Sequence, residues 1–275
     1  MKHLSSPAIL KAHLSALKKR PSKNLSQNFL IDHNIIMKIV QLSQVEEGDT
    51  VLEIGPGPGA LTQALLEKRA SVIAVEKDDI FAKALPELDN QNLLQVINGD
   101  VLELDFGKIL PSDKKVKVIS NLPYNIASPI LGKILPLHER IDDVIVMVQK
   151  EFAERMLGKP HTKAYSSLTL FIQMLATPNG SFDVSPNCFL PRPKVTSTVV
   201  SLSLHPPLMT DYEEFLEFFK LAFRHRRKML SSSLPHEAPF IQSCLEELGL
   251  NPKARPENLS IEDFMKLYDL LFKEG

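Results

Sequence analysis

Apolar runs of strand length alternate with segments of helical periodicity over the first two hundred residues. Residues 35–40 and 60–66 place their apolar side chains at the spacing of one helix face. The strand-like runs are residues 51–54, 71–76, 94–97, 116–120, 144–148, 181–184 and 197–202. This alternation predicts a doubly wound, Rossmann-like α/β domain.

A change of composition at His205-Pro206-Pro207 predicts a domain boundary. Only helical patterns follow it, and Ser260 with Asp263 has the form of a helix N-cap. The expected helices are residues 212–223, 227–233, 240–248 and 261–271. We therefore expect three parts, namely a basic N-terminal arm (1–19), an α/β domain (20–205) and a small C-terminal α-helical domain (206–275).

The N-terminal arm carries a charge that the composition of the whole chain conceals. The 275 residues are 44% hydrophobic and 24% charged, which is typical of a globular protein, and the net charge is −1. Residues 1–28 nevertheless contain six Lys or Arg and no acid. The arm is thus either a solvated tail or a segment that contacts nucleic-acid phosphates through residues such as Arg20 and Lys23.

Cysteine content and hydropathy indicate the compartment. Cys188 and Cys244 form neither a disulfide framework nor a metal-ligand pattern, so we expect no metal and a reducing, cytoplasmic setting. No apolar run approaches the roughly 20 residues that span a bilayer. The acid-free N-terminus leaves an organellar transit peptide as an alternative. Nothing in the sequence demands a dimer, and we expect a monomer.

A glycine-rich turn separates the first strand from the helix at 60–66. Gly55, Gly57 and Gly59 alternate with prolines, and glycines let the backbone turn sharply while a ligand approaches closely. With Ala60 they also fit the dinucleotide pattern of NAD-dependent dehydrogenases, although the prolines remove N–H groups that a pyrophosphate would need. The turn therefore predicts a ligand site without identifying the ligand.

Acidic residues follow the next two predicted strands. Glu76 ends the second strand, 21 residues after Gly55, where an α/β nucleotide fold places a carboxylate for ribose hydroxyls. Asp100 follows the third strand and could accept a hydrogen bond from the exocyclic amine of a purine. Ligands of open α/β sheets bind at the carboxyl ends of the strands, so these residues define one edge.

The fourth strand leads into Asn121-Leu122-Pro123-Tyr124 at the same edge. The exocyclic nitrogen of adenine is a poor nucleophile because its lone pair is delocalised into the ring. The Asn121 side-chain oxygen and the Leu122 carbonyl could accept hydrogen bonds from that amine and direct its lone pair. Tyr124 could stack on the base, which predicts chemistry on an adenine amine without a general base.

These motifs, in this order and spacing, resemble the ribosomal RNA adenine dimethyltransferases, specifically the KsgA type. The resemblance covers roughly residues 18–272 and includes two later blocks. The motifs are residues 27–30 (QNFL), 53–59 (EIGPGPG), 75–76 (VE), 99–100 (GD), 121–124 (NLPY), 148–155 (VQKEFAER) and 189–195 (FLPRPKV).

The resemblance implies S-adenosylmethionine as the methyl donor of a methyltransferase domain. It places Asn28 and Leu30 along the donor site and Gly55 at the methionine portion. Glu76 would hold the ribose hydroxyls and Asp100 the adenine amine of the donor. Asn121 would sit between the donor and the target.

The resemblance also implies the target, which is the exocyclic amine of adenosines, two of them adjacent, in small-subunit (16S-type) ribosomal RNA during subunit biogenesis. Phe189, on a loop fixed by nearby prolines, would face Tyr124 across the target base. The basic segment of the helical domain would contact RNA. Its expected RNA-binding residues are Arg224, Arg226, Arg227 and Lys228.

Three alternatives remain open at this point. A large-subunit methylase of the antibiotic-resistance type shares the catalytic motifs. A ribosome-assembly factor or transcription factor could use the same fold without catalysis, although the intact segment 121–124 argues against this. A dehydrogenase would leave both that segment and the Phe189 loop unexplained.

Overall fold

The computed structural model describes residues 3–22, 25 and 27–272. The chain forms two compact units, the first from Met1–Ala153 with Thr177–His205 and the second from Glu154–Ala176 with Pro206–Gly275. Segment 154–176 thus groups with the C-terminal residues and not with the residues that flank it in the chain. Helix α8 (Ser167–Leu175) explains this grouping, because it packs against helices α9 (Tyr212–Phe223) and α11 (Ile261–Phe272).

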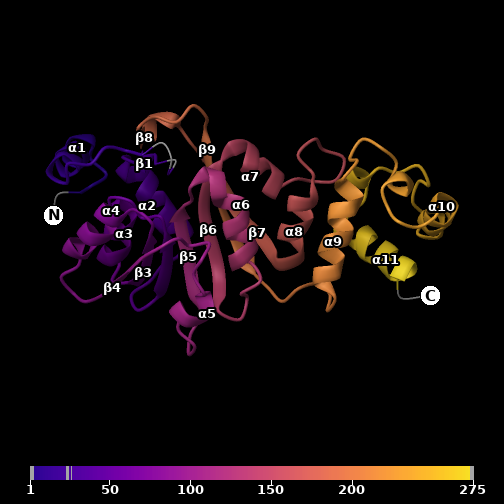
Figure 1. The fold of residues 1–275 in the computed structure, drawn as a ribbon, viewed down its shortest axis with the longest axis horizontal. Coiled ribbons are helices and arrows are strands. Elements are labelled where there is room, and N and C mark those ends of the chain that lie inside the picture. The colour runs from indigo at the N-terminus through magenta and orange to yellow at the C-terminus, as the bar shows by residue number, and fades with distance from the viewer. Residues whose placement is uncertain (1–2, 23–24, 26, 273–275) are drawn as a thin grey trace. The chain divides into compact units, whose positions relative to one another are not determined.

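A seven-stranded sheet forms the centre of the first unit, in the order β4-β3-β2-β5-β6-β9-β7 (Figure 1). Strands β2 to β6 pair in parallel, and β9 pairs antiparallel to β6. The doubly wound α/β fold is therefore confirmed. The strands are β2 (Thr50–Ile54), β3 (Ser71–Glu76), β4 (Leu94–Asn98), β5 (Val116–Asn121), β6 (Ile141–Gln149), β7 (Ala176–Val184) and β9 (Ser197–Leu204).

The strand order reverses between β2 and β5. Their register pairs Val51 with Lys117 and Leu52 with Val118. Nearer the carboxyl ends, the buried hydroxyl of Ser120 accepts a hydrogen bond from the Ile54 nitrogen (2.5 Å) and donates one to the Ile54 carbonyl (3.0 Å). Such a reversal opens a crevice for ligands in α/β sheets.

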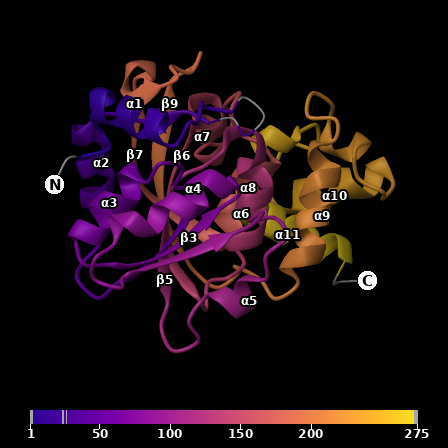
Figure 2. The same cartoon turned by 60° about the vertical axis from the view of Figure 1, so that its left-hand side comes forward.

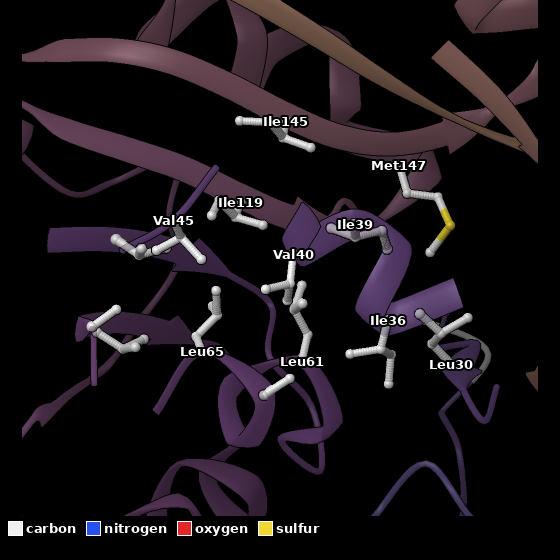
Figure 3. Close-up of a cluster of buried hydrophobic side chains, with 14 of the residues drawn as sticks. Leu30, Ile36, Ile39, Val40, Val45, Leu61, Leu65, Ile119, Ile145 and Met147 are labelled. Carbon is white, nitrogen blue, oxygen red and sulfur yellow. The ribbon is translucent and has the colours of Figure 1, made fainter. Parts of the chain in front are cut away.

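Helices α2 (His33–Leu42) and α3 (Ala60–Glu67) pack on one face of this sheet. Asp32 caps α2 by accepting a hydrogen bond from the Ile35 nitrogen, and apolar side chains at helical spacing then face the core. Figure 3 shows Ile36, Ile39 and Val40 against Leu61 and strand residues. This cluster fixes the start of α3, and hence the glycine turn, relative to the sheet.

The remaining elements of the first unit connect or flank these strands. The short strands β1 (Phe29–Leu30) and β8 (Phe189–Leu190) pair antiparallel, with Leu30 opposite Phe189. The helices are α1 (Pro7–Ala16), α4 (Asp79–Ala84), α5 (Phe106–Ile109), α6 (Ala127–Ile134) and α7 (Lys150–Met156), the last of which continues into the second unit.

The N-terminal arm is folded over much of its length, so the expectation of a solvated tail is wrong for residues 3–17. Helix α1 buries Leu10 and Leu14 in a cluster with Phe29 and Phe81. It lies beside α2 in both views (Figures 1 and 2). The sequence carries no acid here, but its apolar residues recur at helical spacing and find a partner surface.

The second unit is helical. Helices α9, α10 (Ala238–Glu247) and α11 agree with prediction, and Ser260 caps α11 through reciprocal hydrogen bonds with Asp263 (2.9 and 3.1 Å). The helix predicted at 227–233 is wrong, because residues 224–227 form a turn and only a 3₁₀ helix, Leu230–Ser232, follows. Within the residues that the structure describes, no helix is long and apolar enough to cross a membrane.

Candidate active site

A pocket opens at the carboxyl ends of β2, β3, β4 and β5, in the first unit. The N-terminal segment contributes Leu10, Leu25 and residues 27–30 to its wall. The structure therefore brings the predicted donor and target motifs together in one place. The predicted site residues that line this pocket are Asn28, Leu30, Gly55, Glu76, Asp100, Asn121, Leu122 and Tyr124.

The glycine turn has the left-handed backbone that its sequence requires. Gly57 has φ +57°, and a Cβ there would lie 3.1 Å from the Phe29 ring. Its nitrogen donates a hydrogen bond to Glu76 Oε2 (2.8 Å). Because only glycine adopts this conformation without strain, the turn can lie against both β1 and the end of β3.

Glu76 is buried, and backbone groups hold both oxygens of its carboxylate. Oε2 accepts the Gly57 hydrogen bond, and Oε1 accepts one from the Asp78 nitrogen (2.7 Å). Burial raises the pKa of Glu76 despite these bonds. Each oxygen still has a second lone pair, so the fixed carboxylate can accept hydrogen bonds from ligand hydroxyls.

Asp78 links this region to the N-terminal segment. Its carboxylate forms an ion pair with Lys19 (2.6 Å) and accepts hydrogen bonds from the Gln27 amide (3.2 Å) and the Ile80 nitrogen (3.1 Å). The pKa of Asp78 lies below its ordinary value, because hydrogen bonds from Lys19 and Gln27 outweigh burial. Lys19 therefore holds the arm against helix α4 and is engaged within the fold.

Glu53 is a site residue that the sequence reasoning did not single out. It lines the pocket, is 2% exposed and accepts a hydrogen bond from the Thr62 hydroxyl (2.6 Å). Burial raises its pKa to about 8, with a smaller contribution from the Glu76 carboxylate. Its signal in the sequence was a single acid within the apolar strand 51–54.

Asp100 also lines the pocket, after the end of β4. Its Oδ2 forms an ion pair with Lys77 (2.6 Å), and its Oδ1 accepts a hydrogen bond from the Leu102 nitrogen (2.9 Å). The Lys77 hydrogen bond holds the pKa of Asp100 below its ordinary value. The carboxylate is thus charged at neutral pH and suited to accept a hydrogen bond from an amine.

Asn121 ends β5 and lines the pocket. Its side-chain nitrogen donates a hydrogen bond to the Asn28 carbonyl (3.1 Å), so its oxygen is turned away from that carbonyl. The Leu122 nitrogen donates to the Met147 carbonyl of β6 (3.1 Å), which fixes the backbone of the tetrapeptide. Strand β6 therefore holds the backbone expected to receive an adenine amine, and the N-terminal segment holds the Asn121 amide.

Tyr124 lies in a 3₁₀ turn, Tyr124–Ile126, just before α6. Its hydroxyl lies 2.5 Å from the hydroxyl of Ser197, a fully buried residue at the start of β9. Burial raises the pKa of the phenol. The far end of the ring is thus anchored while the residue lines the pocket.

Phe189 does not lie where the sequence placed it. It is 2% exposed, belongs to the apolar cluster that includes Leu30 and Ile36, and does not line the pocket. Its pairing opposite Leu30 in the β1–β8 ribbon directs it into the core. The prolines do fix this loop, but they present the aromatic ring inward.

The predicted RNA-binding residues differ in their surroundings. Arg20 is exposed in the first unit, and Lys23 lies outside the described residues. In the second unit Arg224, Arg227 and Lys228 are exposed. Arg226 instead forms an ion pair with Glu257 (3.0 Å) and donates a hydrogen bond to the Thr162 carbonyl (3.1 Å), which gives it a structural role.

Tyr165 is a packing residue. It is fully buried in the second unit with its ring centroid 6.0 Å from that of Phe223. Among the residues that the structure describes, no group of three or more His, Cys, Asp or Glu side chains could hold a metal ion.

Comparison with known proteins agrees with the geometry of this site. A family model described as ribosomal RNA adenine dimethylase matches residues 18–273. The chain belongs to this family. Ribosomal RNA small subunit methyltransferase A from Protochlamydia amoebophila is 46% identical, and the match covers 97% of this chain and 96% of that protein.

Two solved structures of the family's fold are similar over most of the chain. A dimethyladenosine transferase from Plasmodium falciparum has 28% identity and a TM-score of 0.74, covering 90% of this chain and 98% of that one. The 23S rRNA methyltransferase ErmE has 26% identity and a TM-score of 0.71, covering 89% and 99%. Membership of the family confirms the predicted resemblance, and the dehydrogenase alternative is wrong.

Proposed function

We propose that this protein transfers methyl groups from S-adenosylmethionine to the exocyclic amines of adenosines in small-subunit ribosomal RNA during subunit assembly. One observation carries the proposal. The Asn121 amide is fixed by the Asn28 carbonyl at the point where a pocket lined by three acids meets an anchored aromatic ring. This arrangement supports the proposal that an acceptor for the target amine lies beside the binding site of a positively charged nucleoside donor.

The pocket suits S-adenosylmethionine as the donor. Glu76 would accept hydrogen bonds from the ribose hydroxyls, and Asp100 would accept one from the adenine amine. Gly55 in the glycine turn would approach the methionine portion, with Asn28 and Leu30 along the wall. Carboxylates around the pocket favour a sulfonium cation. Bound there, the donor supplies an activated methyl group.

The target amine would be aligned by the tetrapeptide. Asn121 Oδ1 and the Leu122 carbonyl accept its two N–H groups, which localises the lone pair on nitrogen. Held there, the nitrogen would be aligned with the methyl carbon of the donor, which would supply the methyl group and leave as S-adenosylhomocysteine when its carbon–sulfur bond breaks. The proton leaves to water once the nitrogen is charged, so alignment is the main requirement.

The target base must leave its stack to reach this site, at a cost of a few kcal/mol. Stacking on Tyr124 would offset about 1–3 kcal/mol of that cost. Ser197 holds the ring for this contact. We assign Phe189 a supporting role, since it packs behind Leu30 and backs the donor wall rather than the base.

RNA phosphates would be contacted by exposed cations in both units. Arg224, Arg227 and Lys228 are candidates in the second unit, and Arg20 is a candidate in the first. Such contacts give affinity and register without reading sequence. The identity to a small-subunit enzyme supports the small subunit as partner, and we propose that the protein acts there as a cytoplasmic monomer.

The likeness to ErmE favours large-subunit RNA as the second candidate substrate. Transfer of labelled methyl to undermethylated small subunits, with large subunits alongside, separates the two. Dimethyladenosine confined to small-subunit RNA supports the proposal, and label in the large subunit favours the alternative. If the wild-type protein labels neither subunit, and so transfers no more methyl than the Asn121→Ala variant, a non-catalytic assembly role follows.

A further inference from the structure

Lys133, near the end of helix α6, directs its ammonium group at three backbone carbonyls. The distances from Nζ are 3.5 Å to Val101, 2.7 Å to Leu102 and 2.9 Å to Leu104. An ammonium has three donors and no acceptor, so these carbonyls can use all of its protons. The three residues lie in the segment 101–104, which directly follows Asp100 and begins with a turn.

This turn carries the end of the pocket assigned to the donor adenine. Val101 and Leu102 line the pocket with Asp100, and the Leu102 nitrogen donates to Asp100 Oδ1. The Leu102 peptide units thus connect Lys133 on one side to the Asp100 carboxylate on the other. Lys133 also lies close enough that its charge helps to lower the pKa of Asp100.

The surroundings of Lys133 favour a fixed position. The residue is half-buried, and its ammonium lies 5.6 Å from the ring centroid of buried Phe106. Lys77, which pairs with the other oxygen of Asp100, is 57% exposed at its side chain. Of these two lysines, Lys133 is therefore the one that the fold holds rigidly.

Helix α6 connects Lys133 to the target side of the site. The helix begins at Ala127, directly after the turn that contains Tyr124. Its buried face, which includes Ile130, Leu131 and Ile134, fixes it in the fold. Tyr124 therefore lies in the turn directly before the helix that carries Lys133 near its end.

We propose that Lys133 is a positioning residue that holds the turn at 101–104, and with it Asp100, in the geometry that recognises the amine of the donor's adenine. The inference rests on the proposed function, which assigns Asp100 to that amine. Without the ammonium, three carbonyls lose their partner and the turn relaxes. Recognition of the amine is lost selectively, while the ribose contacts of Glu76 remain.

The test is equilibrium binding of S-adenosylhomocysteine and of its analogue with purine in place of adenine, which lacks the amine. Wild type should bind the parent ligand about tenfold more tightly, as expected for one hydrogen bond to a charged group. Lys133→Met should bind the parent about tenfold more weakly but change by less than about twofold with the analogue. Its KM for the donor should rise while the KM for RNA is unchanged.

Matched variants make the outcomes decisive. Lys77→Met removes the exposed partner of the same carboxylate and should cost less than Lys133→Met. Equal losses for both ligands in Lys133→Met, or none, would overturn the role of Lys133. Wild type that binds neither ligand would instead overturn the proposed function. If Lys133→Met melts early, Lys133→Gln provides the same comparison, and unchanged discrimination there overturns the inference.

Discussion

The side-chain nitrogen of Asn121 donates a hydrogen bond to the backbone carbonyl of Asn28 over 3.1 Å, although 93 positions separate the two residues. The N-terminal segment therefore decides which way the Asn121 amide points. An amide that could flip would offer its NH₂ group to the target amine half the time. The contact makes Asn121 an oriented acceptor.

Asn121→Ala should abolish methyl transfer and leave donor affinity nearly intact. Removing one oriented hydrogen-bonding group from a reacting centre lowers kcat by about 10²–10³. Single-turnover transfer and calorimetric binding of S-adenosylhomocysteine measure the two quantities separately. A parallel loss of donor affinity would show that Asn121 belongs to the donor site.

Arg226 and Arg227 are adjacent, yet they should respond differently to substitution by Gln. Arg227→Gln should weaken RNA binding and reduce the slope of log K against log salt by about 1, since it removes one phosphate contact. Arg226→Gln should instead lower the free energy of unfolding by about 1 kcal/mol, because it breaks the Glu257 ion pair. Salt titrations and urea unfolding of both proteins check this, and an unchanged slope in Arg227→Gln would place that residue outside the RNA contact.

Glu53 should make the protein less stable as pH rises. Its folded pKa of about 8 lies above the ordinary value of 4.5. Between these values the unfolded chain has lost the proton and the folded chain keeps it, so the free energy of unfolding falls by about 1 kcal/mol per pH unit. Its contribution is complete below pH 4.5 and lost by about pH 8.

Glu53→Gln isolates this effect, because the amide oxygen can still accept the Thr62 hydrogen bond. Urea unfolding at several pH values should give a flatter profile for the variant than for the wild type. Two parallel profiles would mean that Glu53 ionises normally. Glu76 serves as an internal reference, since its raised pKa is present in both proteins.

Two substitutions of Phe189 distinguish a packing role of its ring from stacking on the target base. Phe189→Ala should lower the free energy of unfolding by about 3–5 kcal/mol, the usual result for an aromatic residue in a core. Phe189→Leu keeps most of the buried volume and should retain transfer within about threefold. A Leu variant that is stable but inactive would return Phe189 to the target base, opposite Tyr124.

The sequence predicted the sheet well because its strands are short, apolar and ended by chemically distinct residues. Glu76, Asp100 and Asn121 meet because parallel strands end at one edge, which is a rule of topology. Their assignment to particular groups of the donor and target remains a prediction.

The differences between the expectations and the structure have physical causes. Which way Phe189 points depends on the register of a two-residue ribbon, and the sequence pattern does not specify it. Arg226 and Arg227 cannot be distinguished in the sequence, because the ion-pair partner of Arg226, Glu257, lies 31 residues further along the chain. Helix α1 was missed because its amphipathic character is weak and its burial depends on Phe29 and Phe81. Tertiary contacts decide each of these cases.

The Ser120 hydroxyl is hydrogen-bonded to the backbone of Ile54 where the ends of β2 and β5 separate. Ile54 directly precedes Gly55, and Ser120 directly precedes Asn121. Gly55 begins the turn that we propose binds the methyl donor, and Asn121 begins the tetrapeptide that we propose binds the target amine. The spacing between donor and acceptor is therefore a local property of two neighbouring residues. Changes in the outer strands or in the helical unit would therefore leave this spacing, over which we propose that the methyl group is transferred, undisturbed.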